Sequence, residues 1–131
     1  DFGNLETADA IAAFKPVVGV HGNCDGQDVR FLYPAQQFFV CEGMSVLMTH
    51  IGGYPGHYDL RAQGMIESYR PQLFVCGHSH ILKVIYDDHY QMLTVNPGAC
   101  GLQGWQIVRT ALRFRIEDGN ISDMEVFKLP R

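Results

Sequence analysis

The chain has 131 residues, a formal net charge of −4, and 47% hydrophobic against 18% charged residues. This length and balance fit one single domain, residues 1–131, with a hydrophobic core, and they exclude a disordered segment. Because no cluster of Lys and Arg is present we expect no stable nucleic-acid complex, and no apolar run approaches the ~20 residues of a membrane span.

The first half of the chain predicts alternating strands and helices. A helix from about residue 5 to 15 is followed by a strand over 17–21. Two further strands, over 38–41 and 45–49, flank a short turn. An apolar stripe at helical spacing then predicts a helix over 58–69.

The second half predicts an antiparallel meander. Short apolar runs indicate strands over 73–76, 82–86 and 91–95, separated by turn residues. Apolar and basic residues alternate over 108–116, which is the pattern of a half-buried strand, and a last strand follows near 124–129. Two packed sheets with outer helices satisfy both halves, so we expect an α/β fold.

Three of the predicted strands end in side chains that bind divalent metals. Asn23 follows the first run, His50 ends the third, and His78 and His80 follow the strand over 73–76. Strands that end in such residues place them together along one edge of an open α/β sheet. Three such ends in one short chain point to a metal centre.

The donor types restrict the metal. Asp1, Asn23, His50, His78 and His80 supply a carboxylate, an amide oxygen and imidazoles. This mixed set suits Mn²⁺, Fe, Zn²⁺ or Ni²⁺ better than Ca²⁺. A carboxylate can also bridge two ions about 3.5–4 Å apart, which is the separation used in phosphoryl chemistry.

Each residue also has an ordinary structural interpretation. A lone histidine such as His50 is more often a capping or surface residue, and Asn23 after a glycine is usually a turn residue. The stretch 96–98 (Asn-Pro-Gly) can be a turn and nothing more. Three other histidines are interpreted as a strand-end residue and two solvated residues without a metal role: His21, His57 and His89. Only the joint occurrence at strand ends favours the metal interpretation.

The cysteines do not form a metal or redox motif. None of the four lies in a C-x-x-C pair: Cys24, Cys41, Cys76 and Cys100. Zinc-ribbon and thioredoxin sites are therefore weak alternatives. We interpret them as reduced, buried thiols of a cytoplasmic protein.

The motifs resemble a known family. Gly22-Asn23-Cys24-Asp25, Thr49-His50 and Gly77-His78-Ser79-His80, in this order, are similar to the calcineurin-like metallophosphoesterases. The small bacterial and archaeal phosphodiesterase subgroup also carries the Asn96-Pro97-Gly98 turn. The resemblance covers nearly the whole chain, and it implies a four-layer α/β/β/α sandwich.

The resemblance also implies a site and a reaction. Asp1 corresponds to a carboxylate that bridges two divalent ions. The ligands of the second ion correspond to Asn23, His50 and His78, and a ligand of the first ion corresponds to His80. It implies hydrolysis of a small phosphodiester, or less readily a monoester, by a metal-activated hydroxide. Asn23 and His50 are the expected catalytic residues, with Asn23 stabilising charge on the phosphoryl oxygens.

Two departures from the family pattern affect these expectations. The family opens with a strand ending in Asp-x-His, and we expect this first strand-helix-strand segment to be absent, which leaves the first metal site incomplete. Cys24 stands where many relatives have a proton-donating histidine.

The alternative function is a non-catalytic scaffold with this fold. Unpaired strand edges predict a possible homo-oligomer, and Tyr54 or Tyr58 is a candidate to stack on a base or aryl group.

Overall fold

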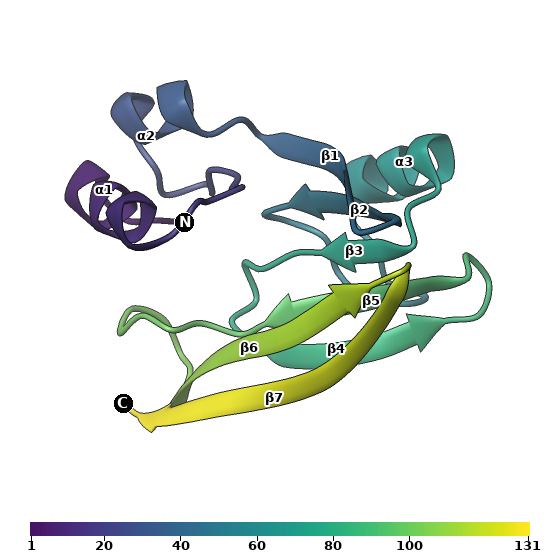
Figure 1. The fold of residues 1–131 in the computed structure, drawn as a ribbon. Helices are drawn as coiled ribbons and strands as arrows, with labels where there is room; N and C mark the ends of the chain where they lie inside the picture. Colours follow the sequence, from purple (N-terminus) through teal and green to yellow (C-terminus); the bar gives the residue numbers. More distant parts are fainter.

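The computed structural model describes the whole chain, residues 1–131. Its helices and strands, labelled in Figure 1, are α1 (Leu5–Phe14), α2 (Gln27–Leu32), β1 (Gln36–Cys41), β2 (Met44–Thr49), α3 (Leu60–Tyr69), β3 (Leu73–Val75), β4 (Leu82–Asp87), β5 (Met92–Pro97), β6 (Val108–Glu117) and β7 (Asn120–Pro130).

Five strands form one mixed sheet in the order β1-β2-β3-β5-β4. The three inner strands β2, β3 and β5 are parallel, with Met48 opposite Val75 and Val75 opposite Val95. The antiparallel strands β1 and β4 close the two sides. Because the inner strands run the same way and stay in register, their carboxyl ends meet at one edge of the sheet, where His50 and His78 follow.

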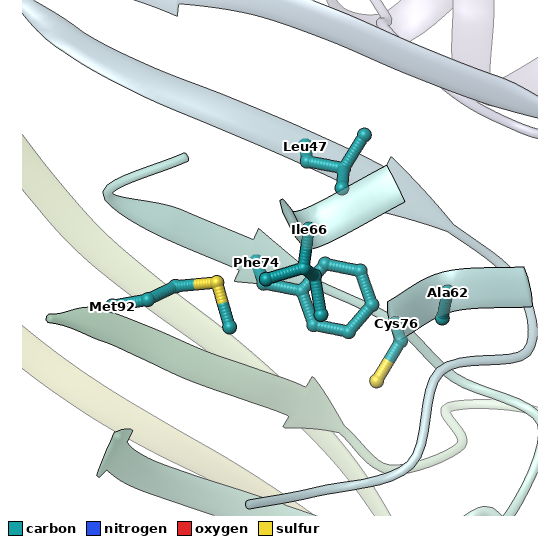
Figure 2. Close-up of a cluster of buried hydrophobic side chains, with 6 residues drawn as sticks. All are labelled: Leu47, Ala62, Ile66, Phe74, Cys76 and Met92. Atoms are coloured by element: carbon teal, nitrogen blue, oxygen red, sulfur yellow. The ribbon is translucent and has the colours of Figure 1, made fainter. Parts of the chain in front are cut away.

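One face of this sheet packs against α3. One residue from each inner strand, Leu47, Phe74 and Met92, forms a buried cluster with Ala62 and Ile66 of the helix. Figure 2 shows the Ile66 side chain lying over the Phe74 ring. The period of two along each strand and of about four along the helix puts these residues on facing surfaces.

The other face packs against the β6-β7 hairpin, which forms a separate two-stranded sheet. Val46, Leu73 and Val95 point to this side and contact Leu112 and Phe114 of β6. The alternation predicted for 108–116 is therefore confirmed, and so is the α/β class. The layers run α3, five-stranded sheet, hairpin, while α1 and α2 lie beside the sheet and not over the hairpin (Figure 1).

Local signals placed most of the elements. Asn4 caps α1 by accepting a hydrogen bond from the Thr7 N–H at 2.8 Å. Glu42 and Gly43 adopt φ angles of 48° and 79°, which is the turn that joins tightly paired strands such as β1 and β2. The strands of the second half also lie within a few residues of their predicted bounds. The predicted antiparallel meander is wrong at its start, because β3 pairs in parallel with β5 and not with β4, which follows it in sequence.

Two predictions for the first half are wrong. Residues 17–21 form no strand, because their only backbone hydrogen bond is from the His21 N–H to the Pro34 carbonyl. Helix α2 was not predicted, since its six residues carry no apolar period and begin at a glycine cap without a side-chain acceptor. Short elements like these are decided by tertiary contacts and not by local pattern.

The prediction that the thiols are buried is wrong for three of the four cysteines, since Cys41 is only half-buried. All four thiols are free, but Cys24 and Cys100 are exposed, and only Cys76 is buried. Burial raises the pKa of the Cys76 thiol to about 11. No helix of the structure is long and apolar enough to span a membrane.

Candidate metal centre

Four of the five predicted ligands converge at the carboxyl edge of the sheet. The Asn23 Oδ1 lies 2.9 Å from the His50 Nε2 and 3.2 Å from the His78 Nδ1. The two imidazole nitrogens are themselves 3.2 Å apart. The Asp1 Oδ2 lies 3.3 Å from the His50 Nε2. His50 and His78, 28 residues apart in sequence, therefore sit on the same side of the domain.

These spacings are those of donors around one ion. Donors bound about 2.1 Å from a common ion lie roughly 3.0 to 3.4 Å from their neighbours in octahedral or tetrahedral geometry. No group of three or more His, Cys, Asp or Glu side chains is placed to hold an ion by itself, so Asp1, His50 and His78 would need the Asn23 amide oxygen to complete a ligand set.

The loop after β3 has an unusual backbone. His78 and His80 both have positive φ, at 70° and 62°. Non-glycine residues reach this left-handed region at a cost, and they persist only where the surroundings hold them. The positive φ at both positions redirects the chain after β3, so that the two imidazoles do not simply follow the alternation of a strand.

Asn96, at the end of β5, holds this loop. It is buried, and its Nδ2 donates to the Gly77 carbonyl at 3.0 Å and to the Ser79 Oγ at 3.1 Å. Its Oδ1 accepts from the Gly98 N–H at 3.0 Å, which makes the turn. The alternative that this Asn-Pro-Gly stretch is only a turn is therefore wrong, because the same side chain also holds the Gly77 carbonyl before His78 and the Ser79 hydroxyl between His78 and His80.

Asp1 is positioned by the turn that carries Asn23. Its Oδ1 accepts a hydrogen bond from the Cys24 N–H at 2.7 Å, which leaves Oδ2 directed at His50. The carboxylate lies directly against Gly22, where an added Cβ would collide with it. Glycine at position 22 is thus required by the close approach of Asp1.

The Asp25 carboxylate holds the segment on which Asp1 lies. It is buried and accepts hydrogen bonds from the N–H groups of Phe2, Gly3 and Gly22 at 2.8 to 3.0 Å. Burial opposes its ionisation, but these backbone donors outweigh burial, and the pKa of Asp25 is below its usual value. The Gly-Asn-Cys-Asp motif contains Asp25, but no pattern in the sequence indicates this role.

His50 carries a neutral ring at neutral pH. Burial first, and then the amino terminus and His78, lower the pKa of His50 to about 4. A neutral imidazole has the lone pair that a metal needs, so these surroundings favour coordination over protonation.

His80 lies apart from the four-residue cluster. Its Nδ1 is 2.8 Å from the Gln106 Oε1, and no donor of the cluster lies within hydrogen-bond distance of it. A role for His80 in a separate first site stays a prediction.

Comparison with known families shows to which family this chain belongs. The calcineurin-like phosphoesterase superfamily domain matches residues 1–119. The chain belongs to this superfamily.

Solved structures show that the fold is that of the metallophosphoesterases. A Thermotoga maritima protein is 23% identical with a TM-score of 0.66, and the match covers 97% of this chain and 75% of that protein's chain. Vps29 of Entamoeba histolytica with Zn²⁺ is 15% identical with a TM-score of 0.69, covering 97% and 76%. An archaeal phosphodiesterase is 19% identical with a TM-score of 0.67, covering 97% and 79%. No curated protein sequence matches the chain.

The residues of this phosphoesterase-superfamily chain fit one divalent ion. Asn23, His50 and His78 bring three donors of suitable type to the spacing of a ligand shell, and Asp1 adds a carboxylate beside them. At His80 the Gln106 Oε1 contacts only the Nδ1, which leaves the Nε2 for an ion, but none of the other expected ligands lies within hydrogen-bond distance of this ring.

Asp25→Asn is expected to destabilise the chain by about 2 kcal/mol at pH 7, because a charged acceptor of several N–H groups is lost. The folded-state pKa of Asp25 is lowered, so its stabilisation is present above the ordinary pKa of Asp and is lost as the pH falls through the folded value. The difference from the wild type should therefore shrink in acid. Urea unfolding at pH 7 and pH 3.5 measures it.

The control is Asp9→Asn in α1, where the carboxylate is exposed and accepts no hydrogen bond. This variant should unfold like the wild type at both pH values. An Asp25→Asn protein as stable as Asp9→Asn at pH 7 would contradict the role assigned to Asp25.

Proposed function

We propose that this chain is a metal-dependent phosphoesterase that hydrolyses small phosphodiesters. The observation that carries the proposal is the convergence of Asn23 Oδ1, His50 Nε2 and His78 Nδ1, with pairwise distances of 2.9 to 3.2 Å. Membership of the phosphoesterase superfamily supports the reaction class. The shared fold of an archaeal phosphodiesterase supports the diester over the monoester.

Each residue of the cluster has a defined part in this proposal. His50 and His78 hold the ion through the His50 Nε2 and the His78 Nδ1, and Asp1 adds a negative charge, since its Oδ2 lies 3.3 Å from the same His50 Nε2. Asn23 directs its Oδ1 to the ion, while its Nδ2 makes no hydrogen bond within the protein. That free amide group can donate to a phosphoryl oxygen, where negative charge develops during hydrolysis.

A bound divalent ion supplies a hydroxide at neutral pH and neutralises charge on the phosphate. The donor set suits Mn²⁺, Ni²⁺, Zn²⁺ or Fe. We propose that His80 belongs to the site of the first ion, which is less complete than the cluster of Asn23, His50 and His78.

The experiment is hydrolysis of bis(4-nitrophenyl) phosphate by the EDTA-stripped chain after addition of Mn²⁺, Ni²⁺, Zn²⁺ or Fe²⁺ one at a time. We expect release of 4-nitrophenol that depends on the added metal and exceeds the rate with 4-nitrophenyl phosphate. Calorimetry on the same samples measures metal binding.

The two measurements separate the competing functions. Metal binding without hydrolysis for all four ions would favour the non-catalytic scaffold, the alternative function for this fold. Hydrolysis that survives EDTA would reject the metal-dependent mechanism.

A further inference from the structure

A cavity of about 330 Å³ adjoins the candidate metal centre. His78 lies in its wall, together with the loop after β2 and the first residues of β4. The residues that concern its chemistry are Gly53, Tyr54, Ser79 and Lys83. A substrate with its phosphorus at the metal would extend part of its structure into this cavity.

Lys83 brings a positive charge into the cavity that no carboxylate neutralises. Its Nζ lies 4.2 Å from the centre of the Tyr54 ring, in a cation–π contact. Every ion pair of the structure involves other residues. Asp59 is the one carboxylate in the wall, and it is engaged in capping α3 through the N–H groups of Arg61 and Ala62.

The tyrosines do not offer a free ring for stacking. The Tyr58 hydroxyl donates to Asp87 at 2.6 Å, and its ring packs against the core, so that residue is structural. Tyr54 already has Lys83 over its ring and His57 at 4.8 Å between ring centres. The stacking prediction is therefore replaced by another role for Tyr54, which is to hold the Lys83 ammonium in place.

Ser79 adds a hydrogen-bond donor. Its Oγ accepts from the Asn96 Nδ2 at 3.1 Å and from the Ile81 N–H at 3.3 Å. A hydroxyl oxygen has two acceptor positions, so its own proton is left to donate outward. The N–H groups of Gly53 and Tyr54, in the same wall, donate to no protein acceptor either.

We propose that this cavity binds a second phosphoryl group, carried by the leaving group of the substrate. A point-like ammonium with a hydroxyl and backbone N–H donors suits a tetrahedral oxyanion, whereas a planar carboxylate is best matched by the fork of an arginine. The position beside His78 makes it a subsite of the proposed phosphodiesterase reaction, so this assignment rests on the proposed function. The substrate class is then a phosphodiester with a further phosphate.

The test begins with binding and needs no turnover. The metal-free chain in EDTA is titrated with inorganic phosphate and followed by ¹⁵N–¹H NMR. Shifts are expected at Gly53, Tyr54 and Ser79, and Lys83→Gln should weaken binding about tenfold, equivalent to about 1.4 kcal/mol. Lys128→Gln, an exposed lysine of β7, is the matched control and should bind like the wild type.

A pair of Tyr54 variants tests how Lys83 is held. Tyr54→Phe keeps the aromatic face and should leave phosphate binding unchanged, whereas Tyr54→Leu should weaken it several-fold. Shifts that map elsewhere, or Lys83→Gln binding phosphate as tightly as Lys128→Gln, would overturn the subsite.

Kinetics separates this inference from the proposed function. With the metal-loaded chain, Lys83→Gln should raise KM for a diester whose leaving group carries a phosphate and leave KM for bis(4-nitrophenyl) phosphate unchanged. Equal effects on both substrates reject the subsite while the hydrolase function stands. If the chain binds phosphate through Lys83 but hydrolyses neither substrate, the proposed hydrolase function is rejected, while the anion site itself is supported.

Discussion

Replacing His78 by alanine is expected to remove divalent-metal binding and nearly all metal-dependent phosphodiester hydrolysis. The His78 Nδ1 lies 3.2 Å from both the Asn23 Oδ1 and the His50 Nε2, so its loss opens one side of the proposed ligand shell. Loss of a residue that merely supports a ligand costs 10 to 100-fold in metal affinity. Removing a ligand itself should cost more than about 100-fold, measured by calorimetry with Mn²⁺.

Cys24→Ser is the matched control for this variant. The thiol is exposed, and it is the Cys24 backbone N–H, retained in serine, that binds Asp1. A hydroxide nucleophile makes a covalent intermediate unnecessary, so Cys24→Ser should keep most of the activity. A Cys24→Ser protein as inactive as His78→Ala, or a trapped phosphocysteine, would replace the metal mechanism by a thiol mechanism.

The sequence predicted the part of the site that depends on parallel strands. His50 and His78 each follow an apolar run, and the two runs became β2 and β3 in register. Once two strands are known to be parallel neighbours, the residues after them must meet at one edge. Nothing more than strand position was needed to bring these two side chains together.

The supporting residues could not be found in the same way. The hydrogen bonds that join Asp25 to the Phe2 N–H and Asn96 to the Gly77 carbonyl span 23 and 19 residues of sequence. Which backbone groups these are depends on the path of the loops, and no local pattern encodes that path. The left-handed backbone conformation of His78 could not be predicted from the sequence either, because only the surrounding structure stabilises it.

The failed strand over 17–21 has a similar cause. The segment contains three valines, which favour a strand. A strand forms, however, only when a neighbouring strand exchanges backbone hydrogen bonds with it. Val17–Val20 has no such neighbour in this chain, and the Gly19 carbonyl is instead bound by the Gln37 side chain at 3.0 Å. Asn23 nevertheless reaches the site, because the turn that carries it is fixed by Asp25.

Gly22→Ala is expected to lower metal affinity on the order of 100-fold, which is the upper range for displacing a supporting contact. The added methyl group would occupy the space of the Asp1 carboxylate, so Asp1 must move away from His50. The turn that carries Asn23 must shift as well, because the Gly22 N–H donates to Asp25. Calorimetry with Mn²⁺ gives the affinity, and the activity should fall in parallel.

Gly64→Ala controls for the loss of a glycine as such. Gly64 lies in α3 with no atom within 4 Å of an added Cβ, and alanine there should stabilise the helix by about 0.5–1 kcal/mol without changing metal affinity. If Gly22→Ala folded and bound metal as tightly as Gly64→Ala, Asp1 could not be a ligand. The ion would then depend on Asn23, His50 and His78 alone, because the contacts that join these three side chains to one another do not include Asp1.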